Sequence, residues 1–161
     1  MTDSDDIKKA LFEHFKGDEW ACFDELRFGT GWISERTMDF WAMNVWPAKK
    51  FQTVAIEIKC SRSDFSREKS NLLKTMPALS LCDAFYFAAP IGVLTREDMP
   101  EWAALWEYDP ETKAMKDRPN WTRQNGIGAL FVPSTAFVAS VLRRQSRLEL
   151  LNRYHREKLN Q

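Results

Sequence analysis

Two acids and a lysine are the residues of this chain best suited to chemistry. Glu57 and Lys59 stand two residues apart at the end of an alternating segment, 53–59. Side chains of a strand point alternately to its two faces, so both charged groups share one face, while the aliphatic Val54, Ile56 and Ile58 point to the other face and meet a core. Asp39 lies in a second segment with strand-forming residues, 38–45. An antiparallel hairpin of the two segments would bring Asp39 and Glu57 together near one end.

Carboxylates are hard oxygen donors, and two of them with water and the backbone carbonyl of Ile58 suit Mg²⁺ or Mn²⁺. Such an ion polarises a phosphoryl oxygen and lowers the pKa of bound water, while Lys59 would orient that water or neutralise the transition state. The same residue types also form exposed ion pairs of little energetic weight on solvated sheet faces. From the residues alone, a metal-dependent phosphodiester hydrolase and a structural ion pair are both open.

Other kinds of site find little support. The chain has two histidines, His14 and His155, and neither has metal-ligand spacing with cysteine or with the other. Its three cysteines are scattered and form no closely spaced pair, so neither a disulfide framework nor a structural zinc site is expected. The sequence contains neither a phosphate-loop motif nor a dinucleotide-binding glycine motif, and we therefore expect no nucleotide cofactor.

The size and composition predict one domain spanning residues 1–161, because 44% of the residues are hydrophobic and suffice for a core. The net charge is zero, but residues 1–25 hold eight acids against three lysines, and residues 134–161 hold six Arg or Lys against two Glu. A basic end suits phosphates, and a solvated helix face looks the same. No apolar run reaches membrane-spanning length, so a cytoplasmic protein without a membrane partner is expected.

These residues are positioned by a predicted alternation of helices and strands. The first expected helix begins at Ser4 or Asp5, the second begins within 63–68 and is interrupted near its end by Pro77, and the last spans about 134–160. The expected strands are 21–28, 38–45, 52–59, 83–90, 104–108, 113–117 and 127–132. A crossover helix between 52–59 and 83–90 makes these two strands parallel neighbours. The pattern predicts an α/β fold with a mixed central sheet flanked by α-helices.

A longer pattern supplements the acids and the lysine. It consists of residues 25–29, 36–39, 57–65, Lys74, 82–90 and 99–102, and the block 57–65 is its most specific part. Asp39 followed by Glu57-Ile58-Lys59 resembles the motif of the PD-(D/E)xK nuclease superfamily. Within that superfamily, the longer pattern is most similar to the small bacterial and phage group that includes the MmcB-like DNA repair proteins.

The resemblance implies a restriction-endonuclease-like fold and roles for particular residues. Asp39 and Glu57 would bind Mg²⁺ or Mn²⁺, Lys59 would assist catalysis, and Glu25 would be an accessory acid, with Glu13 as a less favoured substitute. For Arg62 and Lys74 the resemblance suggests contacts with a phosphate, and surface solubilisation explains both equally well. Asp64 reads as an acid at a helix N-terminus, where the helix dipole favours it.

The sequence departs from that pattern at three points. Met38 precedes the first acid, where the motif often has proline, and Thr75 stands where a tryptophan often follows the lysine. The segment between Phe65 and Lys74 is also longer than in similar proteins, so the position of Lys74 in the pattern is less well fixed than that of Glu57.

The function implied is a metal-dependent DNA nuclease that acts in DNA repair or in processing phage or bacterial DNA. The alternative is a non-catalytic DNA-binding or recruiting module that retains the nuclease fold, since folds host diverse functions. Trp32, Trp41 and Trp46 lie near the acids in sequence and are candidates for stacking on unpaired bases, although most tryptophans are core residues. The oligomeric state stays open, with a homodimer as one alternative.

Overall fold

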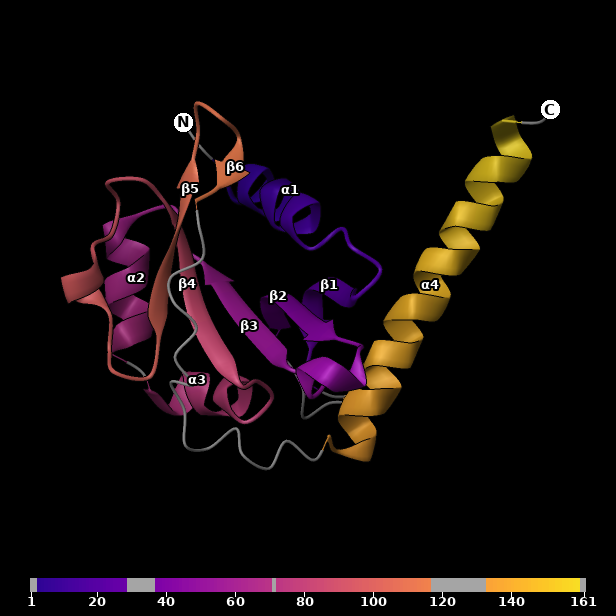
Figure 1. Ribbon diagram of the computed structural model, residues 1–161, viewed down its shortest axis with the longest axis horizontal. Coiled ribbons are helices and arrows are strands. Elements are labelled where there is room, and N and C mark those ends of the chain that lie inside the picture. Colours follow the sequence, from indigo (N-terminus) through magenta and orange to yellow (C-terminus); the bar gives the residue numbers. More distant parts are fainter. Residues whose placement is uncertain (1–2, 29–36, 71, 117–132, 160–161) are drawn as a thin grey trace.

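The computed structural model describes residues 3–28, 37–70, 72–116 and 133–159 (Figure 1). Within these ranges six strands form one sheet in chain order: β1 (Trp20–Arg27), β2 (Thr37–Asn44), β3 (Thr53–Ile58), β4 (Ala84–Pro90), β5 (Ala104–Asp109) and β6 (Ala114–Met115). Strand β2 is antiparallel to both of its neighbours, β1 and β3, whereas β3, β4 and β5 are parallel and β6 returns antiparallel to β5. The predicted mixed sheet is confirmed, including the parallel pairing of the strands on either side of the crossover.

Helices flank the sheet, which confirms the predicted α/β class. They are α1 (Ser4–His14), α2 (Arg62–Lys69), α3 (Leu72–Leu79) and α4 (Thr135–Leu159), with short 3-10 helices η1 (Pro47–Lys49) and η2 (Arg96–Asp98). The predicted terminal helix agrees with α4 to within a residue or two. The strand predicted at 127–132 lies outside the described residues. Among those that are described, no helix is both long and apolar enough to cross a membrane.

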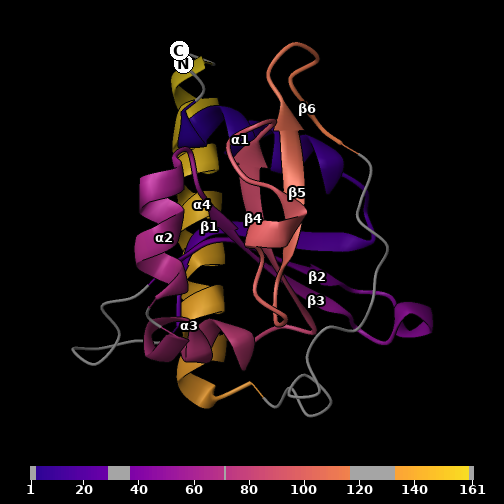
Figure 2. The same cartoon turned by 90° about the vertical axis from the view of Figure 1, so that its left-hand side faces the viewer.

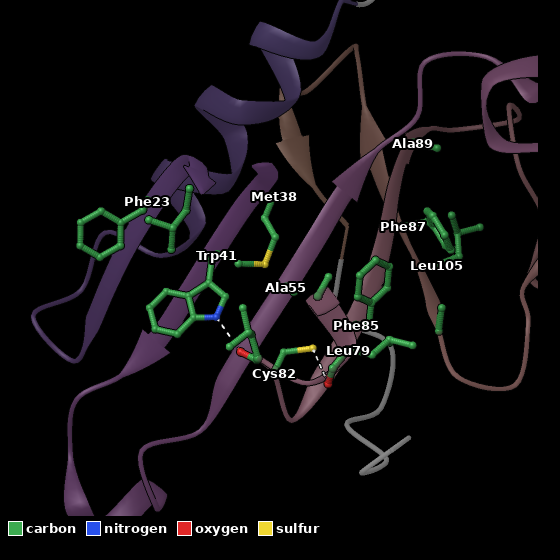
Figure 3. Packing of buried hydrophobic residues seen from close by; sticks show 14 of the residues in the cluster. Phe23, Met38, Trp41, Ala55, Leu79, Cys82, Phe85, Phe87, Ala89 and Leu105 are labelled. Carbon is green, nitrogen blue, oxygen red and sulfur yellow. Dashed lines mark hydrogen bonds between the residues drawn. The ribbon is translucent and has the colours of Figure 1, made fainter. Parts of the chain in front are cut away.

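Each face of the sheet buries its own hydrophobic cluster. On one face, Val54, Ile56 and Ile58 of β3 pack with α1, whose Ile7 and Leu11 are fully buried. The opposite face buries Ala55 of β3 with aromatic residues of β2 and β4, and α2, α3 and α4 cover it (Figures 2 and 3). The period-two alternation predicted for β3 is therefore observed, and it places Glu57 on the face covered by three helices.

One connection differs from the prediction, because the crossover contains two helices and not one. Helix α2 begins earlier than expected: Ser61, not Ser63, is the cap, and its Oγ accepts from the backbone N–H of Asp64 at 3.3 Å. The chain leaves the first helix at Ser70, whose hydroxyl donates to the Ser66 carbonyl at 2.8 Å. Serine hydroxyls that bond back to carbonyls compete with the helical backbone. Pro77 lies inside α3 and does not end it.

Two polar contacts hold the elements nearest the site. At the start of the parallel pair, Asp83 Oδ2 accepts from the backbone N–H of Thr53 at 2.8 Å and from its hydroxyl at 3.0 Å, which ties β4 to β3. At the sheet edge, Arg144 of α4 pairs with Asp24 of β1, with Nη2 and Oδ1 2.6 Å apart. The first part of α4 therefore packs on β1, while its C-terminal part extends away from the body (Figure 1).

Candidate functional site

A cavity of about 480 Å³ opens where the β2–β3 hairpin ends and the chain passes from β3 into α2. The residues that line it come from β2, β3, both crossover helices and the neighbouring segments: Ser4, Phe28, Thr37, Asp39, Glu57, Ile58, Lys59, Asp64, Glu68, Thr75 and Ala78. Four of these residues are acids and one is a lysine. The structure thus brings Asp39, Glu57, Ile58 and Lys59 to one place.

Hairpin geometry explains why Asp39 reaches the cavity. Pairing between β2 and β3 runs from Met43–Thr53 to Phe40–Ile56. Beyond the last pair, Asp39 Oδ2 accepts a hydrogen bond from the backbone N–H of Ile58 at 2.8 Å. A side chain thus replaces the next backbone bond between the strands and directs the Asp39 carboxyl group toward β3. It lies beside Glu57, the residue that follows Ile56 in β3.

The electrostatics of Glu57 follow from this crowding. The pKa of Glu57 is raised to about 8: burial is the largest cause, the negative charges of Asp39 and Glu68 add to it, and the positive charge of Lys59 opposes it. Two carboxyl groups that share a partly dry site cannot both ionise cheaply. The site therefore keeps a proton at neutral pH unless another cation takes its place.

Lys59 is the cation at the centre of the site. Its side chain is 7% exposed, and its Nζ lies 3.5 Å from Glu57, 3.9 Å from Asp64 and 4.0 Å from Glu68. Burial lowers the pKa of Lys59, but the charges of the four surrounding acids outweigh burial and leave the pKa above its ordinary value. Lys59 consequently remains a positively charged ammonium and is poorly suited to act as a base.

Two residues of this cavity were not identified from the sequence. Glu68 of α2 is buried, and it lies one helical turn beyond Asp64, so both acids face the cavity. In the sequence, the four-residue spacing of Asp64 and Glu68 shortly after the strand was the signal that both acids share one helix face. Thr75 of α3 is also buried, and its hydroxyl has no hydrogen-bond partner among the described residues. Thr75 also lines the cavity, so this buried hydroxyl lies close to whatever fills it.

The structure does not bring Glu25 into the cavity. In register with Asp39 on the neighbouring strand, Glu25 would share its face if β1 alternated regularly. Instead its φ is +46°, a left-handed conformation uncommon outside glycine, and Leu26 takes the inward place beside Phe23. The Glu25 side chain is 61% exposed and pairs with Lys8 of α1 at 2.6 Å. Glu25 raises the pKa of Lys8, and the charge of Asp39 raises it as well.

The other residues proposed from the sequence lie outside the cavity or outside the described residues. Arg62 pairs with Asp98 of η2, and Glu13 pairs with Lys16 on the surface. Lys74 is part of α3, but its side chain is not among those described. Trp41 is a core residue whose Nε1 donates to the Leu81 carbonyl at 2.9 Å, and Trp46 is exposed at the far end of β2 from Asp39. Trp32 lies outside the described ranges.

The donor set fits a hard divalent cation. Asp39 and Glu57 supply carboxylate oxygens, Ile58 also lines the cavity, and the excess of acids over Lys59 favours a cation. The described residues contain no cluster of three or more His, Cys, Asp or Glu arranged to hold a metal. Such a cluster is not required here, because Mg²⁺ usually keeps several waters and uses one or two carboxylates.

Together, the fold and the site define an α/β protein with an acidic cavity at one end of a mixed sheet. Neither a protein-family model nor a curated protein matches the chain. One solved structure is similar: SPO1766, a protein of unknown function from Silicibacter pomeroyi, with a TM-score of 0.58, 18% sequence identity and 92% coverage of each chain. At this identity the similarity supports the fold and carries no information about activity.

Proposed function

We propose that this protein is a metal-dependent deoxyribonuclease that hydrolyses phosphodiester bonds in DNA repair or in processing phage or bacterial DNA. The observation that carries the proposal is the meeting of Asp39, Glu57 and Lys59 in one cavity, with Lys59 Nζ 3.5 Å from Glu57 Oε2. The resemblance of the same residues to the PD-(D/E)xK motif, and the mixed sheet that presents them, support it. Fold alone does not establish chemistry, so the proposal rests on the site.

In this proposal Asp39, Glu57 and the Ile58 carbonyl hold Mg²⁺ or Mn²⁺. The bound ion would polarise the phosphoryl oxygen and lower the pKa of a bound water. Lys59 neutralises charge that develops on the phosphate, because it is a buried cation that stays protonated. Asp64 and Glu68 lie within 4.0 Å of Lys59 and fix the ammonium in its position. Glu57 must release its proton when the cation arrives.

The test combines cation binding with cleavage. The wild-type protein and the Glu57→Gln, Asp39→Asn and Lys59→Met variants are titrated with Mg²⁺ and Mn²⁺ by calorimetry, and each is incubated with single-stranded, duplex and branched DNA. We expect saturable cation binding and strand cleavage by the wild type. The two carboxylate variants should lose both, whereas Lys59→Met should bind the cation and lose cleavage.

A matched control separates the site from general charge effects. Glu111→Gln removes one exposed acid in the turn between β5 and β6, outside the cavity, and should leave binding and cleavage unchanged. Cleavage that persists equally in all three site variants would contradict the proposal. DNA binding that weakens with added salt but yields no cut strand with either cation would favour the non-catalytic module.

A further inference from the structure

A second, smaller cavity of about 90 Å³ lies where the end of β1 meets α4. Glu25, Leu26 and the buried Ser140 line it together with four arginines, one from the strand and three from the helix: Arg27, Arg143, Arg144 and Arg147. We call these four residues the arginine cluster. About 30 Å³ is one water's share of liquid volume, so this cavity has room for an anionic group of a few heavy atoms.

The acids near the arginine cluster are already paired. Asp24 binds Arg144, and the Glu25 carboxylate binds Lys8 of α1. Among the described residues, neither Arg27, Arg143 nor Arg147 forms an ion pair with a carboxylate. Glu25 lines the same cavity, but its carboxylate is held by Lys8 at 2.6 Å, so the like charges of the arginines are not balanced one for one and attract an anion.

Arg144 has a buried hydrogen-bond donor without an acceptor among the described residues. One terminal nitrogen of its guanidinium is held by Asp24 at 2.6 Å, which fixes the direction of the group. Its Nε is buried and has no acceptor among the described residues. A buried donor without a partner is costly, and guanidinium groups favour phosphate oxygens because their planar forks match them.

The arginine cluster is one strand away from the acidic cavity. Arg27 pairs with Thr37 in the β1–β2 register, and Thr37 lines the acidic cavity together with Phe28, the residue after Arg27. Neighbouring strands are about 4.8 Å apart, so residues of the same β1–β2 pair contribute to both cavities. Beyond the cluster, α4 continues with Arg153, Arg156 and Lys158.

We propose that the arginine cluster binds one phosphate of the DNA backbone and sets the path of the strand into the acidic cavity. The proposal rests on the proposed function in taking DNA as the occupant. A backbone contact of this kind carries no base readout, so it contributes affinity and register without sequence preference. Ser140 and the Arg144 Nε then supply hydrogen bonds beside the charged groups.

The experiment measures binding separately from cleavage. Fluorescently labelled duplex DNA is titrated with the full-length Glu57→Gln protein in Ca²⁺ at several salt concentrations, with and without Arg143→Gln and Arg147→Gln together. Each phosphate contact contributes about 0.9 to the slope of log affinity against log salt. We expect the double change to lower affinity about tenfold and to reduce that slope by about 1. Both arginines are exposed on α4, and circular dichroism checks that the fold is kept.

The matched control is the double change Arg153→Gln and Arg156→Gln, which removes the same charge from the same helix outside the cluster. Equal losses in the two double variants would mean diffuse attraction and would overturn the proposal. Stabilisation by inorganic phosphate that depends on the arginine cluster, with DNA affinity unchanged, would also overturn it in favour of a small-anion site. Cluster-dependent DNA binding without any cleavage by the wild type would support this site while contradicting the nuclease.

Discussion

Asp39 Oδ2 accepts a hydrogen bond from the backbone N–H of Ile58 at 2.8 Å, across the open end of the β2–β3 hairpin. The acid proposed to bind a cation is thus also part of the hydrogen bonding between the strands. Its two roles use different properties, because a hydrogen bond needs an acceptor oxygen and a cation needs charge. Substitutions at this position can therefore separate stability from function.

Asp39→Asn should preserve stability and lose cation binding. The asparagine carbonyl can still accept from Ile58, whereas Asp39→Ala leaves that donor to the cavity and should cost about 1 kcal/mol, the lower end for a lost buried bond. Urea unfolding and calorimetric Mn²⁺ titration measure the two effects. Equal destabilisation by both substitutions would show that the charge, and not the acceptor, matters for folding.

Glu57 should make the protein less stable as the pH rises. Its pKa of about 8 in the folded protein exceeds the ordinary 4.5, so the folded state holds the proton more tightly than the unfolded state. The stabilising contribution of this proton is complete below pH 4.5 and is lost as the pH rises from 4.5 through about 8. Denaturant unfolding in EDTA across this range measures it. Glu57→Gln should flatten the curve, and parallel curves for variant and wild type would refute the assignment.

Glu68→Gln should lower the pKa of Glu57 and weaken cation binding. The negative charge of Glu68 raises the pKa of both Glu57 and Lys59, so removing that charge lowers both pKa values. Removing one of the four acids that line the cavity also weakens its attraction for a cation. Carbon-detected NMR titration of the glutamate carboxyl groups measures the first effect and calorimetry the second. Glu149→Gln, on the exposed face of α4, is the control and should change neither.

Trp41→Phe should destabilise the fold and leave affinity for single-stranded DNA unchanged. The buried indole donates to Leu81, and its ring packs against Phe23 and Phe137, so the loss should be about 1–3 kcal/mol. Trp46→Phe, at an exposed position, should cost less than about 0.5 kcal/mol. Urea unfolding and fluorescence binding test both variants. Weaker DNA binding by a stably folded Trp41→Phe would require base stacking at that residue.

The three thiols should differ in reactivity. Burial raises the pKa of Cys22 to about 11 and that of Cys82 to about 12, whereas Cys60 is exposed. The thiolate is the reactive form, so a disulfide reagent at pH 8 should modify Cys60 quickly and should modify Cys22 and Cys82 only on unfolding. Cys60→Ser should remove the fast phase. Rapid modification of two thiols in the folded wild type would contradict this order.

Much of the fold was predictable because its signals are local. The alternation around Ile56 set the two faces of β3, and the apolar run of β4 indicated a strand buried on both sides. The crossover was predicted as one helix because Pro77 was the strongest breaker in sequence. The break falls instead at Ser70, where side-chain hydrogen bonds compete with the helix.

The candidate site was predictable in part for the same reason. Hairpin pairing indicated that Asp39 and Glu57 would converge, and Lys59 follows from Glu57 by strand period. Glu25 was expected beside them because the resemblance implied an accessory acid near the end of the first strand. A single left-handed residue broke the alternation of β1, and tertiary packing of Leu26 and the Lys8 contact compensate for its conformation.

By itself, the sequence determined the residues that end the β2–β3 hairpin, because alternation and pairing are properties of neighbouring positions. Tertiary structure alone decided that Glu68 and Thr75 face the same cavity, since the angle of a helix against a sheet depends on packing between distant residues. It likewise decided that Arg27 meets arginines more than 100 positions later in the chain. Which charged side chains lie together depends on how the helices pack on the sheet, and the sequence alone does not specify that packing.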